Sequence, residues 1–438
     1  MSEQIIKGGF LILENEVKKG WGVRIKSNTI TEVAPNESLN SSPGVRVFDA
    51  TDKIIAPGFI NGHMHMYGVL SHGITVEAPA SEFSGFLEDF WWPYIENRLD
   101  HGLVEKTSRW ACVEMIKSGI TTFLDVLEAP NAIPGALEIE RSVTEEAGLR
   151  GILTFEACER IDRKNGELGL KENGDFVKKH NREDNLVKGL MSVHTLFTAG
   201  RGFLEKARAM ADKLGCDIHM HLSESSFEPH WALKHYGKRP VMVYDEMGFL
   251  SKNVLASQGV QLDKEEIDII AERGVRLVHI PLSNCEVGGG VAPVPLCLEK
   301  GIPMGLGTDG YINNFFEVMR GAFLIHKAHN QDPATMPAEK VYRMAASGGA
   351  EALGRPELGR LAPGCKADLI TIRLDTPTPV NESNIYDQIV LFRNPGDVID
   401  VIVDGKFIKK KGEILTIDEE KARAELRISA EKFWGATE

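Results

Sequence analysis

The sequence predicts a closed (β/α)8 barrel, the TIM barrel, with a small β-sandwich domain formed from both termini. Three observations lead to this fold class. Eight short apolar segments alternate with helical stretches between residues 54 and 310, as expected for parallel strands joined by helices. Several helical stretches end in glycine directly before the next apolar segment. Histidine, glutamine and aspartate residues stand at the ends of these segments, where barrels of this kind carry their chemistry.

The eight expected barrel strands are short apolar runs. They occupy residues 54–65, 120–126, 150–157, 188–195, 216–222, 253–258, 275–280 and 303–309. Gly119, Gly148 and Gly274 each separate a helical stretch from the strand after it, and glycine supplies the left-handed conformation that ends a helix. An open doubly wound sheet is the alternative fold. No G-x-G-x-x-G motif opens a helix after the first strand, so the closed barrel is preferred.

The two flanks of the barrel contain short β-like runs that are too small to bury a core alone. We expect residues 1–56 and 360–416 to form one composite β-sandwich domain that brings the chain termini together. The metal-dependent barrel then spans residues 57–359. The charge-rich amphipathic pattern of residues 417–438 predicts a C-terminal helix that closes the molecule.

The composition is that of a soluble globular protein with an acidic surface. The 438 residues carry a formal net charge of −13, which argues against binding to nucleic acid or to anionic membranes. The N-terminus lacks the features of a signal peptide, and no apolar run reaches membrane-spanning length. The six cysteines form no C-x-x-C pair, which favours reduced thiols in the cytoplasm. We expect a cytoplasmic homo-oligomer that acts on a small molecule.

A metal site is predicted by two histidines in the first strand. His63 and His65 are separated by one residue, so both side chains point to the same face and can reach one metal ion, while Met64 faces away. His221 and Asp309 stand at the ends of the fifth and eighth strands and are the expected third and fourth ligands. Three imidazoles and a carboxylate suit one divalent ion, zinc or ferrous iron.

A general acid and base is expected three residues after the third ligand. Glu224 stands where the strand that contains His221 gives way to a loop. A carboxylate beside a metal-bound water, but not bound to the metal, is what proton transfer requires. A solvated loop glutamate is the alternative. His219 lies one layer below His221, and we expect it to be a packed, hydrogen-bonded histidine.

Five further side chains are candidates for substrate contact. His194, Gln258 and His279 end the fourth, sixth and seventh strands, Asn284 follows the seventh, and Trp92 follows the first. The alternatives are a structured loop around Asn284 and simple core packing of Trp92. The seven remaining histidines are expected at the surface or in loops. They are His72, His101, His180, His230, His235, His326 and His329.

Read together, these motifs resemble the amidohydrolase superfamily, in its cytosine deaminase-like branch, which includes adenosine-type and guanine deaminases and triazine chlorohydrolases. The segments that carry the resemblance are 57–65, 91–92, 221–224, 279–284, 288–294, 306–309, 361–369 and 403–406. The resemblance implies a single divalent metal held by His63, His65, His221 and Asp309. It also implies that Glu224 is the catalytic acid and base.

The resemblance implies a reaction as well. Metal-bound hydroxide would attack an sp² ring carbon of a small N-heterocyclic substrate, Glu224 would relay the proton to the ring nitrogen, Asp309 would assist as a base, and ammonia would leave. The enzyme would then be a hydrolase of carbon–nitrogen bonds. A triazine-type hydrolase that displaces chloride or another group is the alternative. A binuclear cyclic amidase and a non-catalytic ligand-binding relative fit the residues less well.

One position departs from the family pattern. The family usually has a histidine at the end of strand six, where this chain has Gln258. Glutamine can donate and accept hydrogen bonds, but it cannot take up a proton near neutral pH. The triazine chlorohydrolases tolerate a similar change. We therefore expect catalysis that depends on Glu224 and Asp309, with a leaving group that needs little help from strand six.

Overall fold

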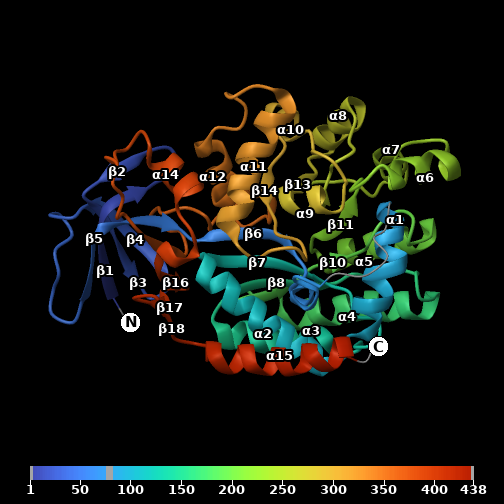
Figure 1. Cartoon of the computed structure of the whole chain (residues 1–438), viewed down its shortest axis with the longest axis horizontal. Helices are drawn as coiled ribbons and strands as arrows, with labels where there is room; N and C mark the ends of the chain where they lie inside the picture. The colour runs from blue at the N-terminus through green and yellow to red at the C-terminus, as the bar shows by residue number, and fades with distance from the viewer. Residues whose placement is uncertain (1–2, 75–81, 436–438) are drawn as a thin grey trace.

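The computed structural model describes residues 3–74 and 82–435, which form a parallel barrel beside a second, mixed sheet (Figure 1). The barrel strands are β6 (Phe59–Met64), β7 (Ile120–Leu127), β8 (Arg150–Phe155), β9 (Val187–Gly189), β10 (Met191–Ser192), β11 (Ile218–Leu222), β12 (Val254–Gln258), β13 (Arg276–His279) and β14 (Met304–Leu306). β9 pairs with β8 and β10 pairs with β11, and Leu190 alone separates β9 from β10. β9 and β10 therefore act as one interrupted strand, and the ring is the predicted eight-stranded (β/α)8 barrel.

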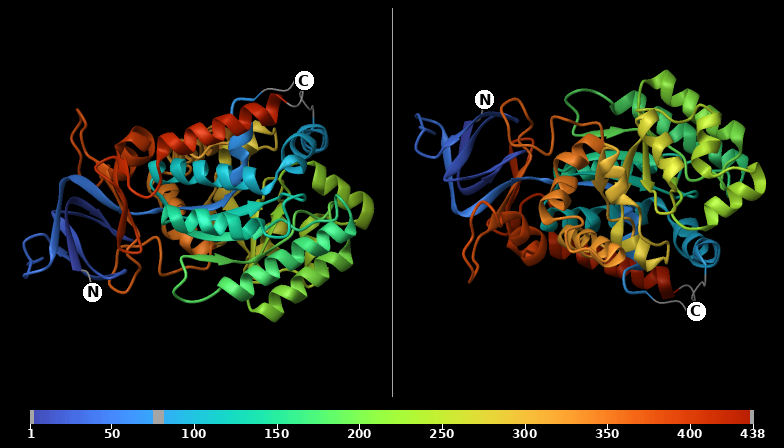
Figure 2. Two further views of the ribbon diagram at one scale, coloured as in Figure 1. Left: turned by 90° about the horizontal axis from the view of Figure 1, so that it is seen from below. Right: turned by 90° about the horizontal axis from the view of Figure 1, so that it is seen from above.

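Helices surround the barrel strands on the outside (Figure 2). The longer helices between the strands are α2 (His101–Ser118), α3 (Ala136–Ala147), α4 (Arg163–His180), α5 (Arg201–Leu214), α6 (Phe227–Tyr236), α7 (Pro240–Glu246), α8 (Lys264–Arg273), α11 (Phe315–Asn330) and α12 (Ala338–Ala345). The π-helix η2 (Phe86–Ile95) follows α1 directly, and the shorter helical segments are η1 (Met66–Ser71), α1 (Phe83–Gly85), η3 (Glu96–Arg98), α9 (Pro281–Glu286), α10 (Val294–Glu299) and α13 (Ser347–Ala352). Gly119, Gly148 and Gly274 cap α2, α3 and α8 with φ values of 83°, 75° and 70°, which confirms the predicted helix ends.

The expected first strand, residues 54–65, is wrong in one respect, because the chain changes sheets at Gly58. Residues before it belong to β5 (Arg46–Pro57) of the mixed sheet, and residues after it form β6 of the barrel. An apolar run that is buried in both sheets gives no sign of this division. The close packing explains the glycine, since a Cβ atom at Gly58 would lie 2.1 Å from Oγ1 of Thr121.

The mixed sheet combines strands from both ends of the chain. Its strands are β1 (Glu3–Ile12), β2 (Val17–Lys19), β3 (Trp21–Lys26), β4 (Thr29–Pro35), β5, β15 (Leu369–Arg373), β16 (Val398–Val403), β17 (Lys406–Lys410) and β18 (Glu413–Ile414), with α14 (Ile385–Phe392) and η4 (Pro395–Asp397) between β15 and β16. β5 and β15 pair antiparallel and join the two flanks. Arg150 of β8 ties the barrel to this sheet, with Nε 2.8 Å from Asp368 and Nη2 3.1 Å from Asp404.

The C-terminal helix does not bring the chain ends together. α15 (Glu419–Gly435) runs along the barrel beside α2, and the N and C labels of Figure 1 lie at opposite ends of the molecule. Lys117 of α2 holds the start of α15 through an ion pair of 2.8 Å with Glu419. The expectation of neighbouring termini is therefore wrong, although the two flanks share one sheet.

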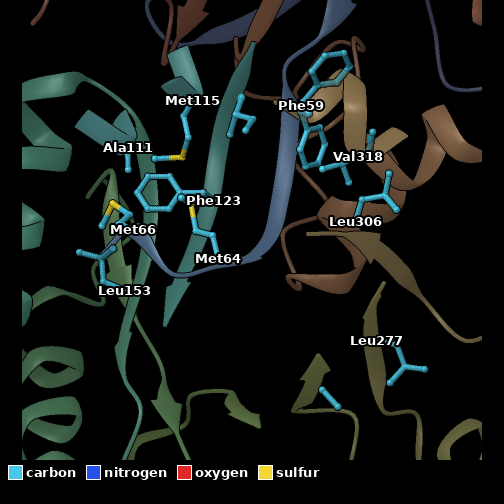
Figure 3. Packing of buried hydrophobic residues seen from close by; sticks show 14 of the residues in the cluster. Phe59, Met64, Met66, Ala111, Met115, Phe123, Leu153, Leu277, Leu306 and Val318 are labelled. Atoms are coloured by element: carbon cyan, nitrogen blue, oxygen red, sulfur yellow. The ribbon is translucent and has the colours of Figure 1, made fainter. Parts of the chain in front are cut away.

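Apolar side chains fill the space between the barrel strands and the outer helices. Figure 3 shows Phe123 of β7 packed between Met64 of β6 and Met115 of α2. Each fully buried side chain of this size contributes about 1.5–3 kcal/mol to stability. Because Met64 points into this cluster, the flanking His63 and His65 point to the barrel interior. No helix among residues 3–74 and 82–435 is long and apolar enough to cross a membrane.

Candidate active site

Three of the predicted metal ligands meet inside the barrel mouth. The ring centroid of His63 lies 4.9 Å from that of His65 and 4.8 Å from that of His221. One ligand atom from each of the three histidines lies within 4.8 Å of the others. Asp309, just after β14, places Oδ1 3.1 Å from His65 Nε2 and 3.7 Å from His63 Nε2. The four side chains thus form one cluster at the C-terminal ends of β6, β11 and β14.

The donor set of this cluster fits a divalent metal. His63 is fully buried, and neither ring nitrogen has a hydrogen-bond partner. Such an orphaned buried group costs about 1–3 kcal/mol, which a bound cation would offset. Burial lowers the pKa of His63 to about 4, so the ring is neutral, as a metal ligand must be. Nδ1 of His65 lies 2.5 Å from the carbonyl oxygen of Val126, so Nε2 faces Asp309 and the position where a metal would bind.

Glu156, which directly follows β8, is a site residue that the sequence reasoning missed. Its Oε1 lies 3.0 Å from Nδ1 of His221 and 3.4 Å from Nε2 of His194. Although burial by itself would raise it, the neighbouring His194 and His221 hold the pKa of Glu156 below its ordinary value. The carboxylate is therefore ionised, and its contact with Nδ1 of His221 leaves Nε2 of that ring for a metal. The one sequence signal was a glutamate directly after the apolar Phe155, where a barrel strand ends.

Gln258 and Ser283 hold the second oxygen of Asp309. Gln258 Nε2 donates to Asp309 Oδ2 over 2.9 Å, and Ser283 Oγ donates to the same oxygen over 2.8 Å. Asn284 Nδ2 donates in turn to Oε1 of Gln258. Burial alone would raise the pKa of Asp309, but the neighbouring imidazoles of His63 and His65 hold it well below its ordinary value. Asp309 is thus a fixed, ionised carboxylate.

A cavity of about 320 Å³ opens above the cluster. Its floor includes His65, His221 and Asp309, and Glu224 stands on its wall. Glu224 is half-buried, and burial together with the nearby Asp309 raises its pKa well above the ordinary value. A carboxyl group whose pKa is raised in this way can act as a proton donor toward a ligand in this cavity.

The five expected substrate-contact residues fall into two groups. His194 and Trp92 line the cavity, with ring centroids 6.2 Å apart. Gln258, His279 and Asn284 are buried and do not line it. Gln258 and Asn284 belong to the hydrogen-bonded group around Asp309.

Two buried histidines form a pair away from the cavity. His279 of β13 and His326 of α11 place their Nε2 atoms 3.1 Å apart. The expectation that His326 lies at the surface or in a loop is wrong, because α11 packs against α9 and buries this face. In contrast, His219 is confirmed as a packed histidine, since its two nitrogens lie 3.1 Å and 3.2 Å from the hydroxyls of Ser192 and Ser257.

Comparison with known proteins identifies the family. Residues 54–408 match the Amidohydrolase family. The chain is 36% identical over 413 residues to a 5-methylthioadenosine/S-adenosylhomocysteine deaminase of Thermococcus onnurineus, covering 92% of this chain and 93% of the relative. It is 33% identical over 442 residues to a 5'-deoxyadenosine deaminase of Methanosarcina acetivorans, covering 99% of both chains.

Solved structures with the same fold include two that are described with zinc. An adenosine deaminase from Xanthomonas campestris with bound zinc superposes with a TM-score of 0.90 at 23% identity, over 99% of each chain. An atrazine chlorohydrolase from Arthrobacter aurescens complexed with zinc gives a TM-score of 0.86 at 20% identity, over 98% of this chain and 100% of the other. With the family match over most of its length and relatives above 30% identity, this chain belongs to the amidohydrolase family.

Proposed function

We propose that this amidohydrolase is a metal-dependent aminohydrolase that removes an amino group, as ammonia, from a ring carbon of a nucleoside-like N-heterocycle. The observation that carries the proposal is the convergence of four side chains of metal-ligand type on one cavity that Glu224 also lines. The deaminase names of the relatives with more than 30% identity support the same reaction class. The substrate named for each relative remains a candidate for this chain.

His63, His65, His221 and Asp309 would hold one divalent ion, and we propose zinc. When bound, the ion lowers the pKa of water and so supplies a nucleophile at neutral pH. A second group of possible ligand atoms comes from Glu156, His194 and His221. It shares His221 with the first group, and the contact of Glu156 with Nδ1 of that ring suits the positioning of a ligand. A single ion is therefore proposed.

The protein's own groups move the protons. Glu224 in its protonated form would donate to the ring nitrogen next to the reacting carbon, which makes that carbon easier to attack. Asp309, ionised and held by Gln258 and Ser283, would accept a proton from the attacking water. The amino group would take up the proton held by Asp309 and leave as ammonia when its bond to the ring carbon breaks. The remaining hydroxyl would give its proton back to Glu224 and become the carbonyl of the product ring. His194 and Trp92 would fix the ring in the cavity.

Product analysis tests this proposal. The full chain loaded with zinc should be incubated with 5'-deoxyadenosine, 5'-methylthioadenosine, guanine, cytosine and a chlorinated triazine, with ammonia and chloride measured separately. We expect ammonia from at least one aminated purine and no chloride. Chloride release without ammonia would favour the triazine-type reaction. Full metal occupancy with neither product from any compound would contradict the proposed function.

We also propose that the protein works in the cytoplasm as a homo-oligomer. The six cysteines are all unpaired in the structure, as expected for a reducing compartment. Sedimentation at several protein concentrations would test the oligomeric state, and a single monomeric species throughout would contradict it.

A further inference from the structure

Five acidic side chains line the cavity, and no lysine or arginine does so among residues 3–74 and 82–435. The five are Glu96, Glu156, Glu224, Glu286 and Asp309. The basic groups on the lining are histidines, and two of the four, His65 and His221, face the metal cluster. A third, His194, lies against Glu156. The cavity thus offers an incoming anion no guanidinium or ammonium partner from the described part of the chain.

Arg160 stands behind the cavity wall, but its guanidinium already interacts with neighbouring side chains. Nη2 donates to Glu96 Oε2 over 2.9 Å, Nη1 donates to Asn97 Oδ1 over 2.8 Å, and Nε donates to Glu128. The guanidinium also lies 5.0 Å from the ring of Trp92. Trp92 lines the cavity, whereas Arg160 does not. All three donor nitrogens and one face of the cation are therefore engaged inside the protein.

Metal binding would not make the cavity attractive to anions. A divalent ion brings two positive charges, and the ionised Asp309 and Glu156 balance them. Glu286 adds a further carboxylate at the end of α9, where it is exposed and lines the cavity. The partial burial of its carboxyl group and the nearby Asp309 raise the pKa of Glu286 to about 7, so near neutral pH it is partly ionised and becomes fully ionised above that pH.

The other wall is aromatic. Phe83, Phe86, Phe90 and Trp91 line the cavity along α1 and η2. The rings of Phe86 and Trp91 stack with centroids 5.6 Å apart. Aromatic faces favour apolar groups and attract cations, but they offer nothing to an anion.

We propose that the cavity selects aminated heterocycles whose ring substituent is uncharged or cationic, and rejects those with a phosphate or carboxylate, with Glu286 as the specificity-determining residue at the mouth. This inference rests on the proposed aminohydrolase function. This chain would then accept a narrower range of substrates than the names of its relatives describe. A methylthio or deoxy nucleoside would be accepted, and a substituent that ends in a carboxylate would be disfavoured.

Product-like ligands test charge selection without turnover. Inosine, inosine 5'-monophosphate and 5'-amino-5'-deoxyinosine share one ring and differ in the charge of the substituent. With the zinc-loaded full chain, calorimetry should find the phosphate form bound on the order of tenfold to a hundredfold more weakly than inosine. The amino form should bind at least as tightly as inosine. The difference should shrink as salt is raised, because salt screens charges near the surface.

The results separate the inference from the proposed function. Equal or tighter binding of the monophosphate, or no binding of any of the three ligands, would overturn the inference. Charge-selective binding without ammonia release from any aminated purine would leave the inference standing and overturn the proposed function.

Substitution of Glu286 tests its assignment. Glu286→Lys should move the binding ratio of the monophosphate to inosine by roughly tenfold toward the anion, and Glu286→Gln should move it part of the way. Glu272→Gln is the matched control, because that side chain lies on α8 outside the cavity and is 73% exposed. An unchanged ratio in Glu286→Lys would contradict the role of Glu286.

Discussion

Gln258 and Asp309 both adopt the left-handed backbone conformation, with φ values of 77° and 61°. Residues other than glycine rarely do so, and such strained positions gather at functional sites. Here the strained residues end β12 and follow β14, and their side chains are hydrogen-bonded to each other. At the scale of single residues, the fixed carboxylate of Asp309 is therefore built by two strand ends together.

The replacement Gln258→His tests this arrangement. Imidazole can still donate to Asp309, so the metal should be retained, but it also titrates near neutral pH. We expect a new ionisation close to about pH 6–7 in the dependence of kcat/KM on pH. Metal content by elemental analysis is the control. A pH profile identical to that of the parent would show that position 258 does not influence the reacting groups.

Glu224→Gln should keep the metal and the fold and lose roughly 10²–10⁴-fold in kcat, because the amide cannot relay a proton. Steady-state ammonia release measures the loss, and the thermal unfolding midpoint checks the fold. Glu272→Gln again serves as the carboxylate control. If Glu224→Gln turned over at the parental rate, Glu224 would be an ordinary wall residue of the cavity.

At the scale of elements, α3 and β7 enclose a pair of buried carboxyl groups. Glu140 of α3 is 1% exposed, and neither of its carboxyl oxygens has a hydrogen-bond partner. Burial, with the nearby Asp125, raises the pKa of Glu140 well above its ordinary value, and burial raises that of Asp125 to about 6. Asp125 also accepts a hydrogen bond of 2.6 Å from the backbone N–H of Met66, next to His65. The pair thus supports the strand end that holds His65, a proposed metal ligand.

The raised pKa values of this pair predict how stability depends on pH. The folded state retains protons that the unfolded chain loses above about pH 4. The contribution of these groups is therefore fully present at lower pH and declines as the pH rises through about 6. Glu140→Gln removes one of the groups, so urea unfolding should depend less on pH between about pH 5 and pH 8. At the upper end of this pH range, the variant should also be more stable than the parent protein. An unchanged pH dependence would contradict the assignment.

Gly58, which connects β5 to β6, is the basis of a second prediction at this scale. Gly58→Ala places a methyl group against the buried side chain of Thr121 at the start of β7, where the β-branched residue has little freedom to move. We expect a loss of about 1–3 kcal/mol in the free energy of unfolding by urea. Gly202→Ala is the matched control, because nothing lies within 4 Å of its added Cβ. By helix propensity, Gly202→Ala should leave the free energy of unfolding unchanged or raise it by up to about 1 kcal/mol.

At the scale of the whole molecule, the metal would join three strands from distant parts of the sequence. Ligand binding to the folded state alone stabilises it, by about 2.7 kcal/mol when the free ligand is a hundredfold above Kd. We expect about one zinc per chain by elemental analysis, and a fall in Tm when a chelator removes it. His65→Ala should bind little zinc and show no chelator effect. Two metals per chain, or full occupancy in the variant, would contradict the single-ion site.

Much of this architecture could be predicted from the sequence, since each barrel strand is an apolar run with a polar residue near its end. His63 and His65 follow from the period of two along a strand, and Asp309 from the closure of strand eight against strand one. Glu156 could not be found in this way, because its role depends on His221 and His194, which reach it only across the barrel. The burial of His326 likewise depends on how α11 packs.

The pairing of β5 with β15 has a consequence for synthesis on the ribosome. β5 leads directly into the strand that ends in His63 and His65, yet its neighbour spans Leu369–Arg373, more than three hundred residues later. A nascent chain therefore emerges with this edge of β5 open until most of the polypeptide has been made. Unpaired edges of this kind invite association between chains. Translation speed and chaperone supply would then influence how much active enzyme a cell obtains.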